Sequence, residues 1–182
     1  LGDVTDAKAL QEACKGIDWV FHVAAVADYW RADADWMHTV NVEGTRYVLQ
    51  AAQDQGVQRV VFTSSAAAIG LPDGDTHPAD ETTPFNLSPE NFPYGYTKVQ
   101  AEEVVHEFVA QGLDVVTVNP VVVLGPGDLN RISGDFVIKT AQMQWLVPAT
   151  HGGIAVIDVR DVARMHIVAA EKGQTGEKYI LC

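Results

Sequence analysis

Two tyrosines and one lysine stand close together in the segment PYGYTKVQAEE, where the pattern predicts the first turns of a helix. Tyr94 and Lys98 are four residues apart, so on a helix their side chains lie on one face, one turn apart. Tyr96 has no such partner, because the residue four positions later is Gln100. An ammonium beside a phenol stabilises the phenolate and lowers the pKa of the phenol from its usual value of ~10. Tyr94 and Lys98 could therefore act as a general acid and base.

A second group of chemically useful side chains follows a predicted strand. The segment RVVFTSSAAAIG indicates a buried strand that ends in the hydroxyl residues Thr63, Ser64 and Ser65. Residues 70–92 separate this group from Tyr94, and they contain prolines, five acidic residues and no lysine or arginine. This composition predicts a long surface loop.

Strands and helices alternate along the chain. Short apolar segments rich in β-branched or aromatic residues predict buried strands, and apolar residues at helical spacing predict helices between them. The predicted strands are 19–23, 57–62, 115–118, 154–157 and 178–181; the helical patterns are 40–51, 101–108 and 162–170, with a short helix near 136–144. Gly56 and Gly112 each follow a helix and precede a strand, where a left-handed cap is expected. The alternation predicts an α/β fold with a doubly wound parallel sheet and a ligand site at the carboxyl ends of its strands.

The composition excludes several classes of partner. The chain has 182 residues and a net charge of −12, from 24 acidic and 12 basic residues, which argues against nucleic acid and anionic membranes. Cys14 and Cys182 are far apart and the histidines lack ligand spacing, so no disulfide framework and no metal are predicted. No apolar run approaches ~20 residues, so no membrane span is predicted. A reducing, cytoplasmic compartment fits best.

Six ordered blocks resemble the extended short-chain dehydrogenase/reductase family, also called the NAD-dependent epimerase/dehydratase family. One block is the strand-end serine combined with Tyr-x-x-x-Lys. The others are GDVTD at 2–6, VFHVAA at 20–25, NVEGT at 41–45, NPVVVLGPGD at 119–128 and IDVRDVA at 157–163. The resemblance implies a Rossmann-like fold, and the sequence is most similar to the branch of dihydroflavonol-reductase-like proteins and hopanoid-associated sugar epimerases.

The resemblance implies a role for each catalytic candidate. Tyr94 would donate and accept the proton, and Lys98 would depress the pKa of the tyrosine and hold the nicotinamide ribose. Ser65 would polarise the reacting carbonyl, because the family's catalytic hydroxyl directly precedes a run of small residues, here 66–68; Ser64 is the alternative. A strand-end serine can also simply satisfy backbone groups. Asn41 would help to organise the active site, although a mid-helix asparagine is also compatible with a structural role.

The same resemblance implies NAD or NADP as the cofactor. The implied cofactor contacts are Asp3, Val4, His22, Ala24, Ala25, Ser64, Tyr94, Lys98, Asn119 and Pro120. Asp3 could instead begin the helix that follows Thr5, and small residues such as the two alanines are also ordinary core. Asp158 and Asp161 fit a capping arrangement at a helix start.

The family's G-x-x-G-x-x-G turn is missing from this sequence. It belongs to the first βα unit, so we expect that unit to precede Leu1, together with the residue that separates NAD from NADP. Residues 1–182 are therefore interpreted as the central part of one NAD(P)-binding domain, in which 125–153 contribute to the substrate region. Alone, such a chain would expose a sheet edge and face and need not be active.

Several reactions share this set of catalytic residues. Leu124 stands where sugar-nucleotide epimerases commonly carry Tyr, and Trp30 and Trp36 replace a usually polar stretch, which favours reduction or oxidation of a small organic substrate with a ring or aliphatic frame. The expected substrate contacts are Tyr29, Trp30, Ala66 and Trp145, of which the aromatic residues could equally be core. A nucleotide-sugar epimerase or dehydratase and a non-catalytic nucleotide sensor remain alternatives. The expected partner is a small molecule, and a homodimer of the full-length protein is compatible with the family.

Overall fold

The computed structural model describes residues 2–27, 33–72, 74, 78–143 and 153–182. The strands are β1 Trp19–His22, β2 Arg59–Thr63, β3 Val115–Pro120, β4 Val122–Leu124, β5 Val156–Asp158 and β6 Lys178–Leu181. The α-helices are α1 Ala7–Ala13, α2 Ala34–His38, α3 Gly44–Asp54, α4 Pro93–Ala110, α5 Gly134–Gln142 and α6 Val159–Lys172. A π-helical turn, Thr39–Glu43, joins α2 to α3, and a 3₁₀ turn, Ala66–Ala68, follows β2.

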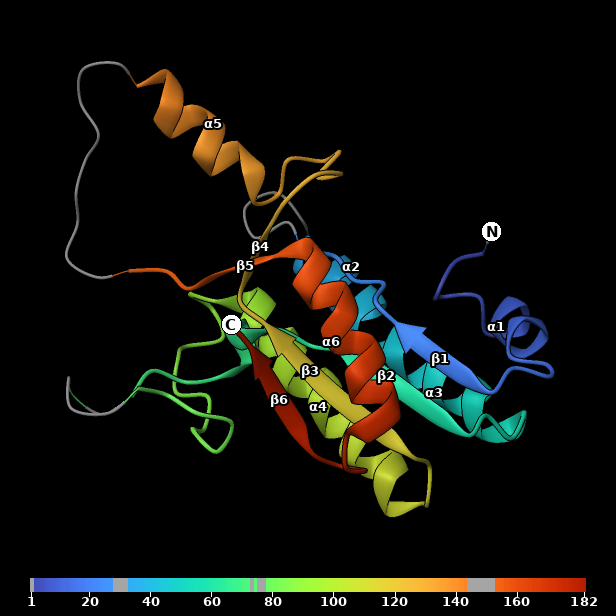
Figure 1. Ribbon diagram of the computed structural model, residues 1–182. Helices are drawn as coiled ribbons and strands as arrows, with labels where there is room; N and C mark the ends of the chain where they lie inside the picture. Colours follow the sequence, from blue (N-terminus) through green and yellow to red (C-terminus); the bar gives the residue numbers. More distant parts are fainter. Residues whose placement is uncertain (1, 28–32, 73, 75–77, 144–152) are drawn as a thin grey trace.

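Four strands form one parallel sheet in the order β1-β2-β3-β6 (Figure 1). The strands ending near Val23, Phe62 and Val118 are therefore neighbours, as the alternation predicts. β2 begins at Arg59, two residues after the predicted start of this strand at residue 57, because the N–H of Val57 still bonds to a carbonyl in the last turns of α3. The sequence pattern also missed β4, which pairs with β5 in a separate two-stranded parallel sheet.

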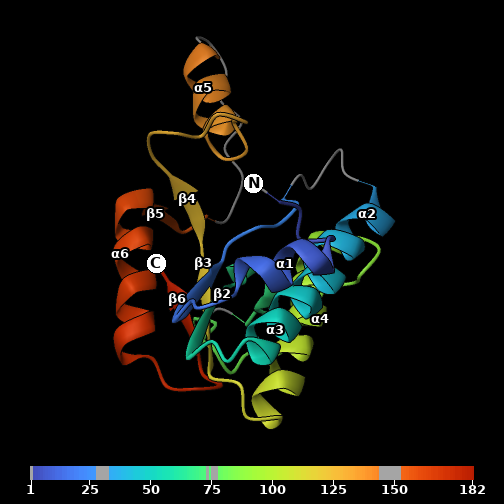
Figure 2. The same cartoon turned by 90° about the vertical axis from the view of Figure 1, so that its right-hand side faces the viewer.

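Helices cover both faces of the larger sheet. Figure 2 shows α6 on one side and α1, α3 and α4 on the other. Side chains alternate along β2, so Val60 and Phe62 pack with α3 and α4, whereas Val61 packs with α6. The two apolar layers hold the carboxyl ends of β1, β2 and β3 in fixed positions relative to the start of α4.

Two surface expectations are met among the described residues. The N–H of Arg160 bonds to Asp158, which caps α6. In the predicted loop 70–92, Gly70 is buried, and the other described residues, 71, 72, 74 and 78–92, are exposed or half-buried. On β1, Trp19 and Phe21 remain 41% exposed, so one face of this strand is uncovered. Asp6 rather than Asp3 caps α1, and Asp3 instead accepts hydrogen bonds from the backbone and hydroxyl of Thr5. None of the helices in the described ranges is long and apolar enough to cross a bilayer.

Candidate active site

The tyrosine and lysine of the Tyr-x-x-x-Lys segment lie on the buried side of α4. The helix begins at Pro93, whose fixed φ suits a first helical position. Tyr94 and Lys98 are only 6% and 2% exposed, whereas Tyr96 is 38% exposed and lies near the ring of Phe85. The structure therefore places Tyr94 with the lysine and turns Tyr96 toward solvent.

Lys98 is held against the end of β2. Its Nζ donates to the carbonyl oxygen of Thr63 at 3.0 Å and lies 5.4 Å from the centre of the Phe62 ring. Burial lowers the pKa of the Lys98 ammonium to about 8, and the nearby Glu102 carboxylate opposes this shift. An ammonium with a pKa in this range can change protonation state near physiological pH.

The two serines after β2 have different partners. Ser64 is buried, and its hydroxyl donates to Oε1 of Glu102 at 2.5 Å. Ser65 is half-buried, and its Oγ accepts the N–H of Ala67 at 3.1 Å and begins the 3₁₀ turn. The Ser65 hydroxyl thus satisfies a backbone group and still keeps its own hydrogen for another acceptor. This arrangement favours Ser65 over Ser64 as the donor to a carbonyl.

Asn119 joins the ends of two strands. Its Nδ2 in β3 donates to the carbonyl oxygen of Ser65 at 2.9 Å and to Oε1 of Glu102 at 2.7 Å. Its Oδ1 is fully buried and has no hydrogen-bond partner among the described residues. A buried acceptor in this state fits a site that receives a donor group from a ligand. Pro120 follows in the same strand and is also buried.

Asn41 links the end of β1 to α4. Its Oδ1 accepts the N–H of Val26 at 2.8 Å, and its Nδ2 donates to the carbonyl of Val26 at 3.0 Å and to Oγ1 of Thr97 at 3.2 Å. The Thr97 hydroxyl in turn donates to the carbonyl of Tyr94 at 2.8 Å. Asn41 sits in the π-helical turn, a helical variant found frequently at functional sites. Asn41 therefore connects backbone groups on both sides of the rim, by which we mean the carboxyl ends of β1, β2 and β3 together with the start of α4. It touches no catalytic side-chain atom.

His22 is buried beneath this rim as a neutral side chain. The hydroxyl of Thr45 donates to the carbonyl of Asn41 at 2.7 Å, so the same hydroxyl accepts the Nε2–H of His22 at 2.9 Å. Burial, and secondarily the positive charge of Lys98, lower the pKa of His22 to about 3. This histidine therefore supports the strand end from below.

The other predicted contacts with the cofactor surround the end of β1. Ala24 and Ala25 are exposed, as is Asp3, while Val4 packs against Gly44 at the start of α3. Exposed methyl side chains at a strand end leave room for a large ligand to approach the backbone. Together with Lys98 and Asn119, these residues fit a nicotinamide dinucleotide. Ala66 is half-buried beside Ser65; Tyr29, Trp30 and Trp145 lie outside the described residues.

Glu102 is the residue at this site that the sequence analysis missed. It is 6% exposed, and it accepts from Ser64 and Asn119 and pairs with Lys178 of β6 at 3.2 Å. The available signal was its position, four residues after Lys98 on the same helical face.

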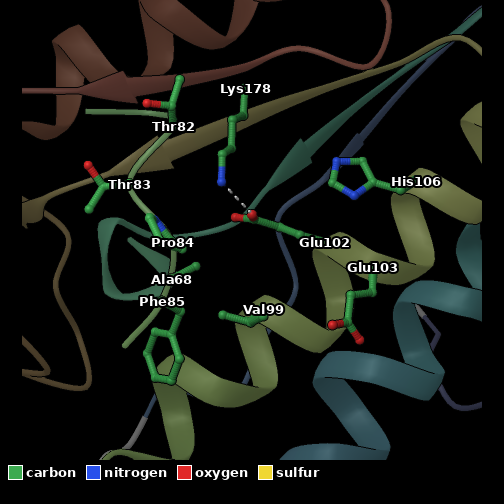
Figure 3. A pocket seen from close by; sticks show the side chains of 10 residues that line it. All are labelled: Ala68, Thr82, Thr83, Pro84, Phe85, Val99, Glu102, Glu103, His106 and Lys178. Carbon is green, nitrogen blue, oxygen red and sulfur yellow. Dashed lines mark hydrogen bonds and ion pairs between the residues drawn. The ribbon is translucent and has the colours of Figure 1, made fainter. Parts of the chain in front are cut away.

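A small pocket borders Glu102. Figure 3 shows the loop residues 82–85 on one side of it and four α4 residues on the other, with Lys178 reaching across to Glu102. Its volume is about 170 Å³, which is below the usual range for ligand pockets. A dinucleotide therefore does not fit here, and the rim above Tyr94 and Lys98 remains the candidate active site.

Comparisons with known proteins identify the family and the type of fold. The profile of the "NAD dependent epimerase/dehydratase family" matches residues 1–182. A Synechocystis protein provisionally named dihydroflavonol 4-reductase is 37% identical over 100% of this chain and 53% of its own length. Cinnamoyl-CoA reductase 1 of Petunia hybrida is 33% identical over 98% of this chain and 55% of its own.

Among solved structures, the dTDP-glucose 4,6-dehydratase DesIV of Streptomyces venezuelae, with NAD bound, superposes with a TM-score of 0.81. It is 28% identical, and the match covers 98% of this chain and 56% of DesIV. The fold is accordingly of the Rossmann type. The chain spans about half the length of the relatives it matches.

Proposed function

The chain belongs to the NAD dependent epimerase/dehydratase family, and on this basis we propose that its full-length protein is an NAD(P)-dependent oxidoreductase that acts on a small organic carbonyl or alcohol. The observation that carries the proposal is the burial of Tyr94 and Lys98 on one face of α4, with Lys98 bonded to the residue directly before Ser64 and Ser65. Proton transfer and carbonyl polarisation can then occur at one rim.

Each residue has a distinct task in the proposed reduction. The Ser65 hydroxyl donates a hydrogen bond to the substrate carbonyl, which increases the positive character of its carbon. Tyr94 donates its phenolic proton to the oxygen as it becomes an alcohol, and the charge of Lys98 stabilises the phenolate that remains. The bound nicotinamide cofactor supplies the hydride. In the direction of oxidation, the Tyr94 phenolate removes the proton from the alcohol.

The proposed substrate carries its carbonyl on a ring or aliphatic frame. Two relatives are named as reductases of small organic compounds, a dihydroflavonol 4-reductase and a cinnamoyl-CoA reductase. In this chain, Leu124 is half-buried in β4 and offers no hydroxyl to a sugar diphosphate. We place residues 125–153, of which 144–152 lie outside the described residues, in the substrate region. We place the protein in the cytoplasm, with a homodimer as the assembly to be tested.

The test uses the full-length protein with NADH or NADPH and a panel of substrates. Oxidation of NAD(P)H by cyclic and aromatic ketones, lost in the Tyr94→Phe variant, is the expected result. Turnover of UDP- or dTDP-sugars with no net change in NAD would instead show an epimerase or dehydratase. Tight cofactor binding with neither activity would show a nucleotide sensor and overturn the proposal.

A further inference from the structure

Donors from three neighbouring strands converge on one carboxylate of α4. The hydroxyl of Ser64, just beyond β2, is 2.5 Å from Oε1 of Glu102, and the amide of Asn119 in β3 is 2.7 Å from the same oxygen. The ammonium of Lys178 in β6 is 3.2 Å from Oε2. Both oxygens are used, which compensates for burying a group that is only 6% exposed. Glu102 thus ties the helix to the carboxyl ends of β2 and β3 and to β6.

The contact with Asn119 extends to the serine proposed to polarise the carbonyl. Both Glu102 Oε1 and the carbonyl oxygen of Ser65 accept from Asn119 Nδ2. Two acceptors on one amide nitrogen fix which way the amide points. The backbone of Ser65 is therefore held by Asn119, whose own orientation depends on Glu102.

Glu102 also acts on Lys98 through charge. The two residues are one helical turn apart, and the Glu102 carboxylate raises the pKa of Lys98 against the larger lowering by burial. Lys98 has a second anchor, the carbonyl of Thr63 at 3.0 Å, but a carbonyl supplies only a partial charge. Removal of the Glu102 charge would therefore lower the pKa of Lys98 further.

We propose that Glu102 is a positioning residue of the active site, which holds Ser65 through Asn119 and Ser64 and places a carboxylate one helical turn from Lys98. It touches neither substrate nor cofactor and acts through these three side chains. The assignment rests on the proposed oxidoreductase function, because Ser65 and Lys98 matter to Glu102 only if they work at the rim. Its role goes beyond the Tyr-x-x-x-Lys pair, since it connects that pair to the serines.

The chain offers a matched control one residue further along the helix. Glu103 is exposed, lines the same small pocket (Figure 3), and has no hydrogen bond or ion pair among the described residues. Glu103→Gln removes the same charge and makes the same change of atoms as Glu102→Gln. A difference between the two variants therefore reports the contacts of Glu102 rather than the overall charge of α4.

The experiment compares Glu102→Gln and Glu103→Gln in the full-length protein with saturating NAD(P)H and the ketone that it reduces best. We expect Glu102→Gln to lower kcat by about 10- to 100-fold, the scale of a small misplacement of catalytic groups, with a smaller change in KM. The pH at which cofactor affinity falls should move to lower values, because Lys98 loses the charge that supports its protonated form. Glu103→Gln should stay within about twofold of the parent in kcat.

The outcomes separate this proposal from the oxidoreductase assignment. If Tyr94→Phe abolishes turnover but Glu102→Gln and Glu103→Gln match in kcat and pH profile, the oxidoreductase assignment stands and the role of Glu102 is refuted. If Glu102→Gln does not fold, Lys178→Met decides, because Lys178 pairs with Oε2 of Glu102 and has no assigned role in catalysis or cofactor binding. That variant removes one donor to the carboxylate, and we expect a loss of about 3- to 10-fold in kcat; a kcat equal to that of the parent would refute the proposal. If Tyr94→Phe retains turnover, the oxidoreductase assignment with Tyr94 as the proton donor is refuted, and the role proposed for Glu102 falls with it.

Discussion

The ammonium of Lys98 donates a hydrogen bond to the carbonyl oxygen of Thr63 at 3.0 Å, so the lysine of α4 is fixed to the last residue of β2. Ser64 and Ser65 follow Thr63 directly. The distance between the lysine and the hydroxyl that would polarise a carbonyl is thus set by a single hydrogen bond and two residues of backbone.

The first prediction concerns the division of labour between Tyr94 and Lys98. Tyr94→Phe should abolish turnover of the full-length protein and leave cofactor binding nearly intact, because only the transferable proton is removed. Lys98→Ala should damage both, since the lysine is assigned to the ribose as well as to the phenol. Measuring kcat and the cofactor Kd for each variant tests this asymmetry.

Tyr96→Phe is the matched control, because Tyr96 is exposed on the same helix. It should keep kcat within about twofold of the parent. Retained turnover in Tyr94→Phe combined with loss in Tyr96→Phe would move the proton donor to Tyr96. Equal loss of cofactor binding in the Tyr94 and Lys98 variants would point to a structural role for Tyr94.

The second prediction concerns pH and cofactor affinity. Lys98 has a pKa lowered to about 8 by burial, so it is charged below this pH and neutral above it. A neutral amine binds the ribose hydroxyls less well, so the Kd for NAD(P)H should rise as pH passes through about 8. In Lys98→Met the Kd should be weak and flat over the same range. A parent curve as flat as that of the variant would contradict the assignment.

The third prediction concerns stability in acid. His22 has a folded-state pKa of about 3 against 6.5 for an ordinary histidine. Between these two pH values the His22 side chain is protonated in the unfolded chain and neutral in the folded chain. Stability contributed by neutral His22 is complete above pH 6.5 and falls as pH decreases toward 3. His22→Gln keeps a donor for Thr45 but cannot titrate. Urea unfolding of parent and variant should give a shallower acid dependence in the variant; parallel curves would exclude His22 as the cause.

The fourth prediction concerns Gly95, between the two tyrosines. A Cβ at this position would lie 2.5 Å from the carbonyl oxygen of Ala67 and 2.6 Å from the Phe92 ring. Gly95→Ala should therefore destabilise the protein by about 1–3 kcal/mol, although alanine normally favours a helix over glycine. It should also lower kcat, because the turn begun by Ser65 must move away from α4.

Gly153→Ala is the control for this substitution, because no atom of the described residues lies within 4 Å of the position where its Cβ would be. Thermal unfolding should show a clear loss for Gly95→Ala and almost none for Gly153→Ala. Equal melting temperatures for the two variants would mean that the close contact with Ala67 is relieved at no cost.

Local sequence patterns predicted the features that depend on neighbours along the chain. The helical spacing of Tyr94 and Lys98 and the apolar runs of the main strands are short-range signals. The parallel α/β pattern also predicted that β1, β2 and β3 are neighbours. The contacts of Glu102 with Ser64, Asn119 and Lys178 join residues 17 to 76 positions apart. A single glutamate in a helix pattern carries no sign of such partners, so this part of the site became visible only in three dimensions.

The short strand β4 was missed for a related reason. Val122–Leu124 continues the apolar run of β3 past Pro120, and nothing in the run marks where one strand ends. Its partner β5 lies more than 30 residues later, so the pairing that defines it is long-range. The π-helical turn at Asn41 could not be predicted from the sequence either, because its hydrogen bonds span only one residue more than those of an α-helix.

The strand order also determines how readily the protein could acquire a different substrate. β2 and β3 are bonded on both sides, and they carry Ser65 and Asn119 at or just beyond their ends. In contrast, α5 has no buried residue among those described and stands away from the sheet in Figure 1. Exchanging residues 125–143 for a related segment would therefore leave the sheet packing intact. If this segment contacts the substrate as proposed, directed evolution could change substrate recognition there without altering the positions of Ser65 and Asn119.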